Sequence, residues 1–316
     1  MKKSIKKRII KIVSIILCIV LVIGCTLMVI ASNYLCNYAI DSQADYGIRV
    51  SMDGVFATPQ EGSWFSEHAK DMYIKSSDGL KLHAFFIENT TENNNGNFMM
   101  VFHGYTSCAA QMSFFAEQFY DMGYSVLLPD ARAHGLSEGR YIGMGWPERL
   151  DNLLWIDEIL KINKNAKIGL FGISMGGSTV INTAGEELPK QVVVAVEDCG
   201  YTSAMEQFSY QMKAIFDLPS FPLLNTAGII AKIKSGVNLY DANSVKQAKK
   251  IKIPTLFIHG KSDTFVPYKM VNELYAAANC EKELLVIENA GHAQSASANP
   301  LLYWSTVTRF IDDAMQ

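Results

Sequence analysis

The sequence lacks the patterns typical of metal sites, disulfide frameworks and repeat proteins. Its six cysteines include no C-x-x-C pair, no H-E-x-x-H run is present, and no internal repeat is visible. Charged residues make up only 19% of the 316 residues and hydrophobic residues 49%. The chain can therefore build one large domain, or one domain plus a small insert. We expect no bound metal, and structural or free thiols without an assignable disulfide at Cys36, Cys108, Cys199 and Cys280.

Charge is unevenly distributed along the chain. Six Lys and Arg residues precede position 12, although the whole chain has a net charge of −3. The remaining residues therefore carry a net charge of about −9. So acidic a body is a poor electrostatic match for nucleic acid, and we expect no nucleic-acid partner.

Residues 12–31 form an apolar run without a charged residue. About 20 helical residues span a hydrocarbon core of roughly 30 Å. We expect a single-pass signal anchor in the cell membrane, with basic residues 1–11 in the cytoplasm and the remainder extracytoplasmic. Two alternatives remain: a signal peptide cleaved near residues 29–31, giving a secreted protein, or a lipobox at residues 21–25 that makes Cys25 a lipidated N-terminus. Residues 32–70 are expected to be a linker that leads into, or packs on, the first strands.

From about residue 71 onward, short apolar runs alternate with helical patterns. Helical spacing is clearest at 149–162 and 266–278. The expected strands begin with a hairpin around an Asp-Gly turn and lie at 72–75, 80–86, 98–102, 124–128, 167–171, 191–196, 255–258 and 283–287. This alternation predicts an α/β domain over residues 71–316, with a mostly parallel sheet, helices on both faces and an antiparallel hairpin at one edge.

The longest interval without an expected strand runs from residue 196 to residue 255. Residues 201–216 and 227–234 have helical patterns, and prolines interrupt the segment between them. Two interpretations remain: an ordinary helical excursion over the sheet, or a small cap over a substrate pocket at about 201–250. The segment is rich in Phe, Tyr, Leu and Met, which would suit an apolar substrate group.

The run Gly172-Ile173-Ser174-Met175-Gly176 matches the G-x-S-x-G pattern. It lies between an apolar strand and a helical pattern, which is the context in which this pattern forms a sharp turn. Gly172 and Gly176 lack a Cβ atom, so strand and helix can approach closely. The turn would expose the hydroxyl of Ser174 at the carboxyl edge of the sheet, where open α/β sheets bind ligands.

Two backbone N–H groups are candidate donors to a developing oxyanion. Met175 begins the helix after Ser174, so its N–H faces the reacting centre at the positive end of the helix dipole. The loop His103-Gly104-Tyr105 follows the strand at 98–102, and the N–H of Tyr105 is the candidate second donor.

A serine hydroxyl needs a general base near neutral pH, and histidine suits that role. In the order serine, acid, histidine, only His292 follows a suitable acid. Asp263, just past the strand at 255–258, is the expected acid that orients the imidazole, and Asp198 is the alternative. The other histidines are expected to have packing roles (His68, His83) or to lie in strand-end loops (His103, His134, His259).

Asp130, His134 and His103 could suggest a metal site. No ligand spacing supports it, and we expect these side chains to shape loops through hydrogen bonds.

Five motifs in chain order resemble the α/β-hydrolase superfamily: HGY at His103, D-x-R-x-H-G-x-S-x-G at Asp130, GISMGG at Gly172, HGKSDTFVP at His259 and GHA at Gly291. The resemblance covers about residue 72 to the C-terminus. Within the superfamily, the chain is similar to bacterial hydrolases of the serine-aminopeptidase and cinnamoyl-esterase-like type. The resemblance implies an eight-stranded sheet, a small helical cap after the sixth strand and no cofactor. It also implies a catalytic triad of Ser174, Asp263 and His292.

These observations predict a serine hydrolase that cleaves a carboxylic ester or related acyl bond through an acyl-enzyme. The expected substrate is a small molecule with an apolar acyl group. Three alternatives remain: an acyltransferase that uses the same acyl-enzyme, a peptidase, and a non-catalytic binding protein on the same fold.

Overall fold

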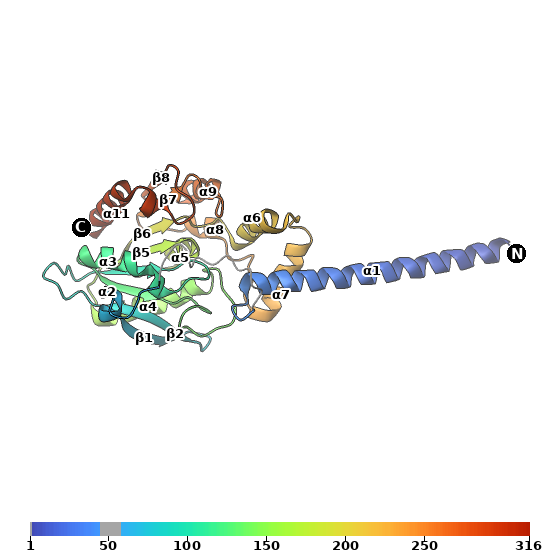
Figure 1. The fold of residues 1–316 in the computed structure, drawn as a ribbon, viewed down its shortest axis with the longest axis horizontal. Coiled ribbons are helices and arrows are strands. Elements are labelled where there is room, and N and C mark those ends of the chain that lie inside the picture. The colour runs from blue at the N-terminus through green and yellow to red at the C-terminus, as the bar shows by residue number, and fades with distance from the viewer. Residues whose placement is uncertain (1, 45–57) are drawn as a thin grey trace.

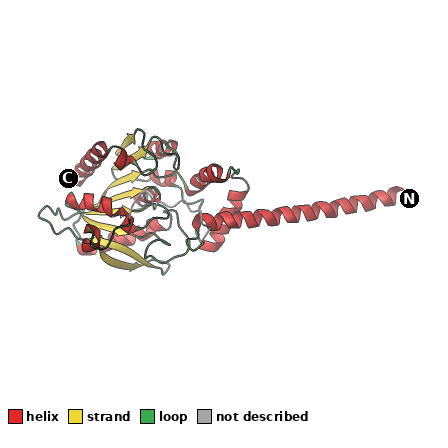
Figure 2. Cartoon of the chain, viewed as in Figure 1, coloured by secondary structure: helices red, strands yellow, loops and turns green. Residues whose placement is uncertain are grey.

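The computed structural model describes residues 2–44 and 58–316, and it consists of an α/β body from which one long helix projects (Figure 1). The projecting helix is α1 (Lys2–Ile40). In the body, strands occupy the centre and helices lie around them (Figure 2).

The body is built on one eight-stranded sheet with the order β1-β2-β4-β3-β5-β6-β7-β8. β1 pairs antiparallel with β2, β2 pairs antiparallel with β4, and all other neighbours are parallel. The eight strands are β1 (Lys70–Lys75), β2 (Lys81–Ile87), β3 (Phe98–Phe102), β4 (Ser125–Pro129), β5 (Ile168–Ile173), β6 (Val192–Asp198), β7 (Thr255–Gly260) and β8 (Lys282–Ile287). The predicted mostly parallel sheet with an antiparallel hairpin at one edge is therefore confirmed.

Helices cover both faces of the sheet, as predicted. On β3, side chains alternate between the two faces, because successive residues of a strand point in opposite directions. Met99 and Val101 pack in the cluster that includes α3 (Ser113–Asp121) and α11 (Pro300–Met315). Met100 packs in the cluster on the other face, which is covered by α4 (Glu148–Ile162), α5 (Met175–Ala184) and α9 (Lys269–Ala277). Shorter helical elements are α2 (Trp64–His68), η1 (Ala109–Met112) and α10 (Ser295–Ala298).

The strand-free interval between β6 and β7 folds into three helices. They are α6 (Ala204–Phe216), α7 (Leu223–Ser235) and α8 (Ser244–Ala248). The first two match the predicted helical segments. We call α6, α7 and the loop between them the cap.

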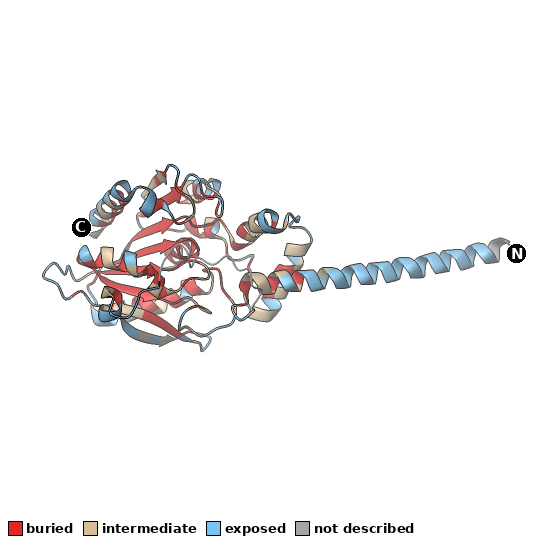
Figure 3. Cartoon of the chain, in the orientation of Figure 1, coloured by how far each residue is buried: buried red, intermediate tan, exposed pale blue. Residues whose placement is uncertain are grey.

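Helix α1 is longer than the predicted membrane segment. Residues 5–27 of this helix are exposed (Figure 3), and Ile5–Ile40 qualifies as a candidate membrane span by length and composition. Residues 32–40, expected in the linker, continue the helix. Ser32, Cys36 and Ile40 recur every four residues, lie on one helical face and are buried.

This buried face packs on the cap and not on the first strands. Helix α1 lies against α7, and the Ser32 hydroxyl donates a hydrogen bond to the carbonyl of Leu223 at 3.0 Å. Residues 32–40, the first part of the expected linker, therefore pack on the cap through their apolar face. Residues 45–57 of the expected linker lie outside the described residues. Further on, α2 leads into β1 as expected.

Candidate active site

Ser174 occupies a strained turn between β5 and α5. Its φ of 60° and ψ of −118° lie in a region that side chains other than glycine rarely adopt. Close packing holds the turn in place. A Cβ atom on Gly172 would lie 2.3 Å from the carbonyl oxygen of Gly176, and one on Gly176 would lie 2.1 Å from the carbonyl oxygen of Phe102. Glycine at both positions is therefore a steric requirement, in agreement with the role predicted from the pattern.

Three residues remote in sequence meet at this turn. The Nε2 atom of His292 lies 2.8 Å from Ser174 Oγ, and its Nδ1 atom lies 2.7 Å from Asp263 Oδ2. Ser174 follows β5, Asp263 follows β7 and His292 follows β8. Because the carboxyl ends of parallel strands meet at one edge, the sheet brings all three residues together there. The arrangement allows the Ser174 hydroxyl to donate to Nε2 while the Nδ1–H group donates to Asp263.

The Asp263 carboxylate is surrounded by hydrogen-bond donors. Its Oδ1 atom accepts from the backbone N–H groups of Phe265 and Val266, both at 2.8 Å. Burial alone would raise the pKa of Asp263, but the hydrogen bonds from His259 and His292 lower this pKa to about 2. Asp263 is therefore ionised at neutral pH, and the Nδ1 atom of His292 must carry the proton between them.

His259 is a second histidine beside the same carboxylate, and only its spacing of four residues from Asp263 could have indicated this contact from the sequence. It was expected in a strand-end loop, but it lies inside β7 and is fully buried. Its Nε2–H group donates to the carbonyl of Val266 at 2.9 Å and lies 3.4 Å from Asp263 Oδ2. His259 thereby ties the loop after β7 to the strand and helps to position the acid.

The two candidate oxyanion donors are Met175, which directly follows Ser174, and Tyr105. Met175 is the first residue of α5, where backbone N–H groups have no acceptor within the helix. Tyr105 follows β3 and lines the same pocket as Ser174. Both positions are compatible with the predicted roles.

The alternative acid, Asp198, is engaged elsewhere. Its Oδ1 atom accepts from the hydroxyl of Ser295 and its Oδ2 atom from that of Tyr303, each at 3.1 Å. Burial raises the pKa of Asp198 to about 6. Asp198 therefore joins the end of β6 to the C-terminal helices, while His292 bonds to Asp263.

Residues 130–139, the motif that begins at Asp130, shape the loops around β4 through hydrogen bonds. Asp130 accepts hydrogen bonds from the buried His83, at 2.7 Å, and from the backbone N–H groups of Ala109 and Leu136. His103 Nε2 accepts from the backbone N–H of Ala131 at 3.0 Å, and His134 Nδ1 contacts the carbonyl of Arg132. These hydrogen bonds give the polar side chains of Asp130, His103 and His134 partners within the protein.

One cluster brings three potential metal ligands together. Single ligand atoms of Cys199, Asp263 and His292 lie within 4.8 Å of one another. Burial raises the pKa of the Cys199 thiol well above its usual value, which disfavours the thiolate that metals bind. The ring nitrogens of His292 are already paired with Ser174 and Asp263. The cluster therefore suits proton transfer better than metal binding.

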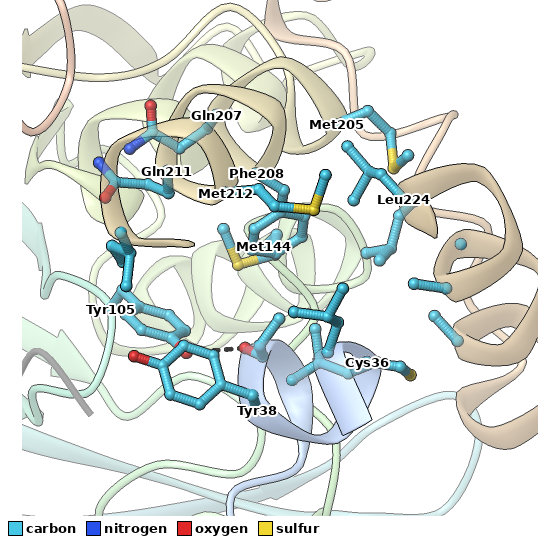
Figure 4. A pocket seen from close by; sticks show the side chains of 18 of the residues that line it. Cys36, Tyr38, Tyr105, Met144, Met205, Gln207, Phe208, Gln211, Met212 and Leu224 are labelled. Atoms are coloured by element: carbon cyan, nitrogen blue, oxygen red, sulfur yellow. Dashed lines mark hydrogen bonds between the residues drawn. The ribbon is translucent and has the colours of Figure 1, made fainter. Parts of the chain in front are cut away.

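Ser174 opens onto a cavity of about 110 Å³ that is lined almost entirely by apolar side chains (Figure 4). The cap contributes Phe208 and Met212 from α6 and Leu224 from α7. Gln207 and Gln211 add two amides at one side, and both donate to the carbonyl of Phe265. An apolar group attached to a reacting carbonyl at Ser174 would fit this space.

Comparison with known proteins identifies a family and proteins of similar fold. A family model described as serine aminopeptidase, S33, matches residues 94–197 and 222–294. Protein YqkD of Bacillus subtilis is 32% identical over 219 residues, which cover 69% of this chain and 72% of YqkD. The Pyrococcus furiosus esterase Pf2001 is similar with a TM-score of 0.65 and 28% identity, over 83% of this chain and 99% of the esterase. An acylaminoacyl peptidase of Pyrococcus horikoshii shares the fold, with a TM-score of 0.59 and 17% identity over 78% of this chain and 41% of the peptidase.

Proposed function

The chain belongs to the serine aminopeptidase S33 family of α/β-hydrolases, and we propose that it is a serine hydrolase that cleaves carboxylic esters with an apolar acyl group. The proposal rests on the 2.8 Å contact between Ser174 Oγ and His292 Nε2 at a strained turn that opens onto an apolar cavity. The projecting helix α1 is proposed to anchor the enzyme in a membrane, with the hydrolase body on the extracytoplasmic side.

The proposed reaction has two steps. His292 removes the proton of the Ser174 hydroxyl as the oxygen attacks the ester carbonyl, and Asp263 stabilises the resulting imidazolium. The N–H groups of Met175 and Tyr105 stabilise the oxyanion. His292 then protonates the leaving alcohol, which leaves an acyl-enzyme on Ser174. In the second step a water molecule, deprotonated by His292, attacks this acyl group and releases the acid.

The cavity favours an ester over an aminopeptidase substrate. An aminopeptidase has to bind the positively charged amino group of its substrate beside the scissile bond. Among the described residues that line the cavity, none is Asp or Glu, and the only side-chain amides, Gln207 and Gln211, donate to the carbonyl of Phe265. An ammonium group there would meet amide oxygens but no carboxylate, so its charge would be buried without a counter-ion, which is costly.

The test uses the purified full chain in detergent, with a fluorophosphonate probe and p-nitrophenyl esters. We expect labelling and ester hydrolysis by the parent chain, and loss of both in Ser174→Ala. The matched control is Ser305→Ala, an exposed serine on α11, which should keep both. Hydrolysis that persists in Ser174→Ala would remove this serine from the mechanism. Cleavage of aminoacyl amides in preference to esters would instead favour the peptidase alternative.

A further inference from the structure

The last turns of α1 form one wall of the cavity at Ser174. Residues 35, 36 and 38–40 of this helix line the cavity together with residues of the cap (Figure 4). The ring of Tyr38 packs edge-on against that of Phe216 at the end of α6, with 5.6 Å between ring centroids. The helix that projects from the body is therefore also part of the enclosure around the candidate nucleophile.

Several bonds attach this wall to the body. Lys234 of α7 donates to the side-chain oxygen of Asn37 at 2.5 Å. The backbone N–H of Ile142 donates to the carbonyl of Ile40 at 2.8 Å. Directly after the helix, the buried Asp41 pairs with Arg140 at 2.9 Å. A segment held by side-chain and backbone bonds from two separate parts of the body is a fixed part of the fold.

A further bond joins α1 to the catalytic loop after β3. The hydroxyl of Tyr105 donates to the carbonyl of Ala39 at 2.7 Å (Figure 4). Tyr105 is also the residue whose backbone N–H is a candidate oxyanion donor. The end of α1 thus contacts both the space beside Ser174 and a loop that takes part in the proposed chemistry.

The cavity is built largely from segments outside the family match. The matched residues begin at 94 and omit 198–221, so α1 and α6 both lie outside them. The nucleophile, acid and base lie inside the matched ranges. Helix α7 also lies inside the matched ranges, so the cavity combines matched segments with α1 and α6, which the family model does not cover.

The surface of the cap beside α1 is apolar as well. Phe221, Ile229 and Ile233 are 75%, 60% and 79% exposed, respectively, and belong to α7 or the loop before it. Helix α7 packs against the end of α1. If α1 spans a bilayer, this surface lies at the interface, where exposed apolar side chains are favourable. An amphiphilic ester would concentrate at the same interface.

We infer that residues 35–40 of α1 are part of the substrate site, where they form one wall of the pocket for the acyl chain. The inference rests on the proposed ester hydrolysis at Ser174. Each methylene that enters an apolar site improves binding roughly fourfold.

The test changes the volume of the wall in both directions in the full chain, with p-nitrophenyl esters from acetate to palmitate. Ala39→Phe fills the pocket from α1, so the octanoate-to-acetate ratio of kcat/KM should fall at least tenfold. Tyr38→Ala enlarges the pocket, so the preferred chain should lengthen by two or more carbons. Matched controls on exposed positions of the same helix, Ala31→Phe and Tyr34→Ala, should keep the parental chain-length profile.

The outcomes separate this inference from the proposed function. Absence of Ser174-dependent ester hydrolysis in the parent chain would overturn the proposed function, and with it the premise of the inference. Hydrolysis with an unchanged chain-length profile in both Ala39→Phe and Tyr38→Ala would overturn the inference alone. A gain on longer chains in Tyr38→Ala cannot result from misfolding, so it supports the inference even where Ala39→Phe fails to fold.

Discussion

Replacing Asp263 with asparagine tests the proposed role of the acid, because the substitution keeps the shape of the side chain and removes one of its acceptors. In the parent, Oδ1 accepts from two backbone N–H groups and Oδ2 faces His292 and His259. All of these neighbours are donors. An amide has one oxygen and one NH₂ group, so it cannot accept from both sides.

The orientation of the new amide follows from its neighbours. If NH₂ faced the backbone, the N–H groups of Phe265 and Val266 would both lose their acceptor, at a cost of about 1–3 kcal/mol each. If NH₂ faces His292, the imidazole can shift its proton from Nδ1 to Nε2 and accept from the amide. The second orientation is therefore favoured. It leaves Nε2 protonated, and a protonated Nε2 cannot remove the proton of Ser174.

We therefore expect Asp263→Asn to lower kcat/KM roughly 10³- to 10⁴-fold, equivalent to about 4–5.5 kcal/mol of transition-state stabilisation. The assay is p-nitrophenyl octanoate hydrolysis, with thermal melting of each variant alongside. The matched control is Asp198→Asn. Its partners, Ser295 and Tyr303, are hydroxyls that can donate or accept, so kcat/KM should fall less than tenfold.

Two results would refute this reasoning. A folded Asp263→Asn variant that keeps more than a tenth of the parental kcat/KM would show that Asp263 does not set the tautomer of His292. A larger loss of activity in Asp198→Asn than in Asp263→Asn would identify Asp198 as the functional acid.

Two further predictions concern stability. Burial raises the pKa of Glu197, which lies in β6 near the turn at Ser174, from 4.5 to about 8. Because the pKa is higher in the folded state, protonation of this carboxyl increases the free energy of unfolding. The increase is complete below pH 4.5, is lost as pH rises through about 8, and amounts to roughly 3–5 kcal/mol. Between about pH 5 and pH 9, the melting temperature of Glu197→Gln should therefore fall less than that of the parent. An equal fall in both would contradict the raised pKa of Glu197. Gly176→Ala should prevent accumulation of folded chain, because its Cβ would lie 2.1 Å from the carbonyl oxygen of Phe102, whereas Gly24→Ala, with open space around it, should be tolerated. A Gly176→Ala chain that melts within a few degrees of the parent would show that the turn is not sterically fixed.

The sequence by itself determined the fold and the candidate site to a large extent. Strand and helix patterns are local, and the glycines around Ser174 signal a close approach that the structure contains. Ser174, Asp263 and His292 lie one, three and five residues after the ends of their strands, and a parallel sheet brings such positions to one edge. Their convergence therefore follows from topology alone, although only coordinates give the 2.7 Å and 2.8 Å distances.

Only the tertiary structure decided what surrounds the nucleophile. Residues 32–40 were expected in a linker, because an apolar helical run looks the same whether lipid or protein covers it. Their partners in α7 lie about 190 positions away, as the bond from Ser32 to Leu223 shows, and no local pattern encodes a contact of that separation. The position of His259 beside Asp263 could not be predicted either, because it depends on how the loop after β7 folds back onto its strand. The residues of the proposed chemistry follow strand ends and can be predicted, whereas the shape of the pocket arises from packing between distant segments and cannot.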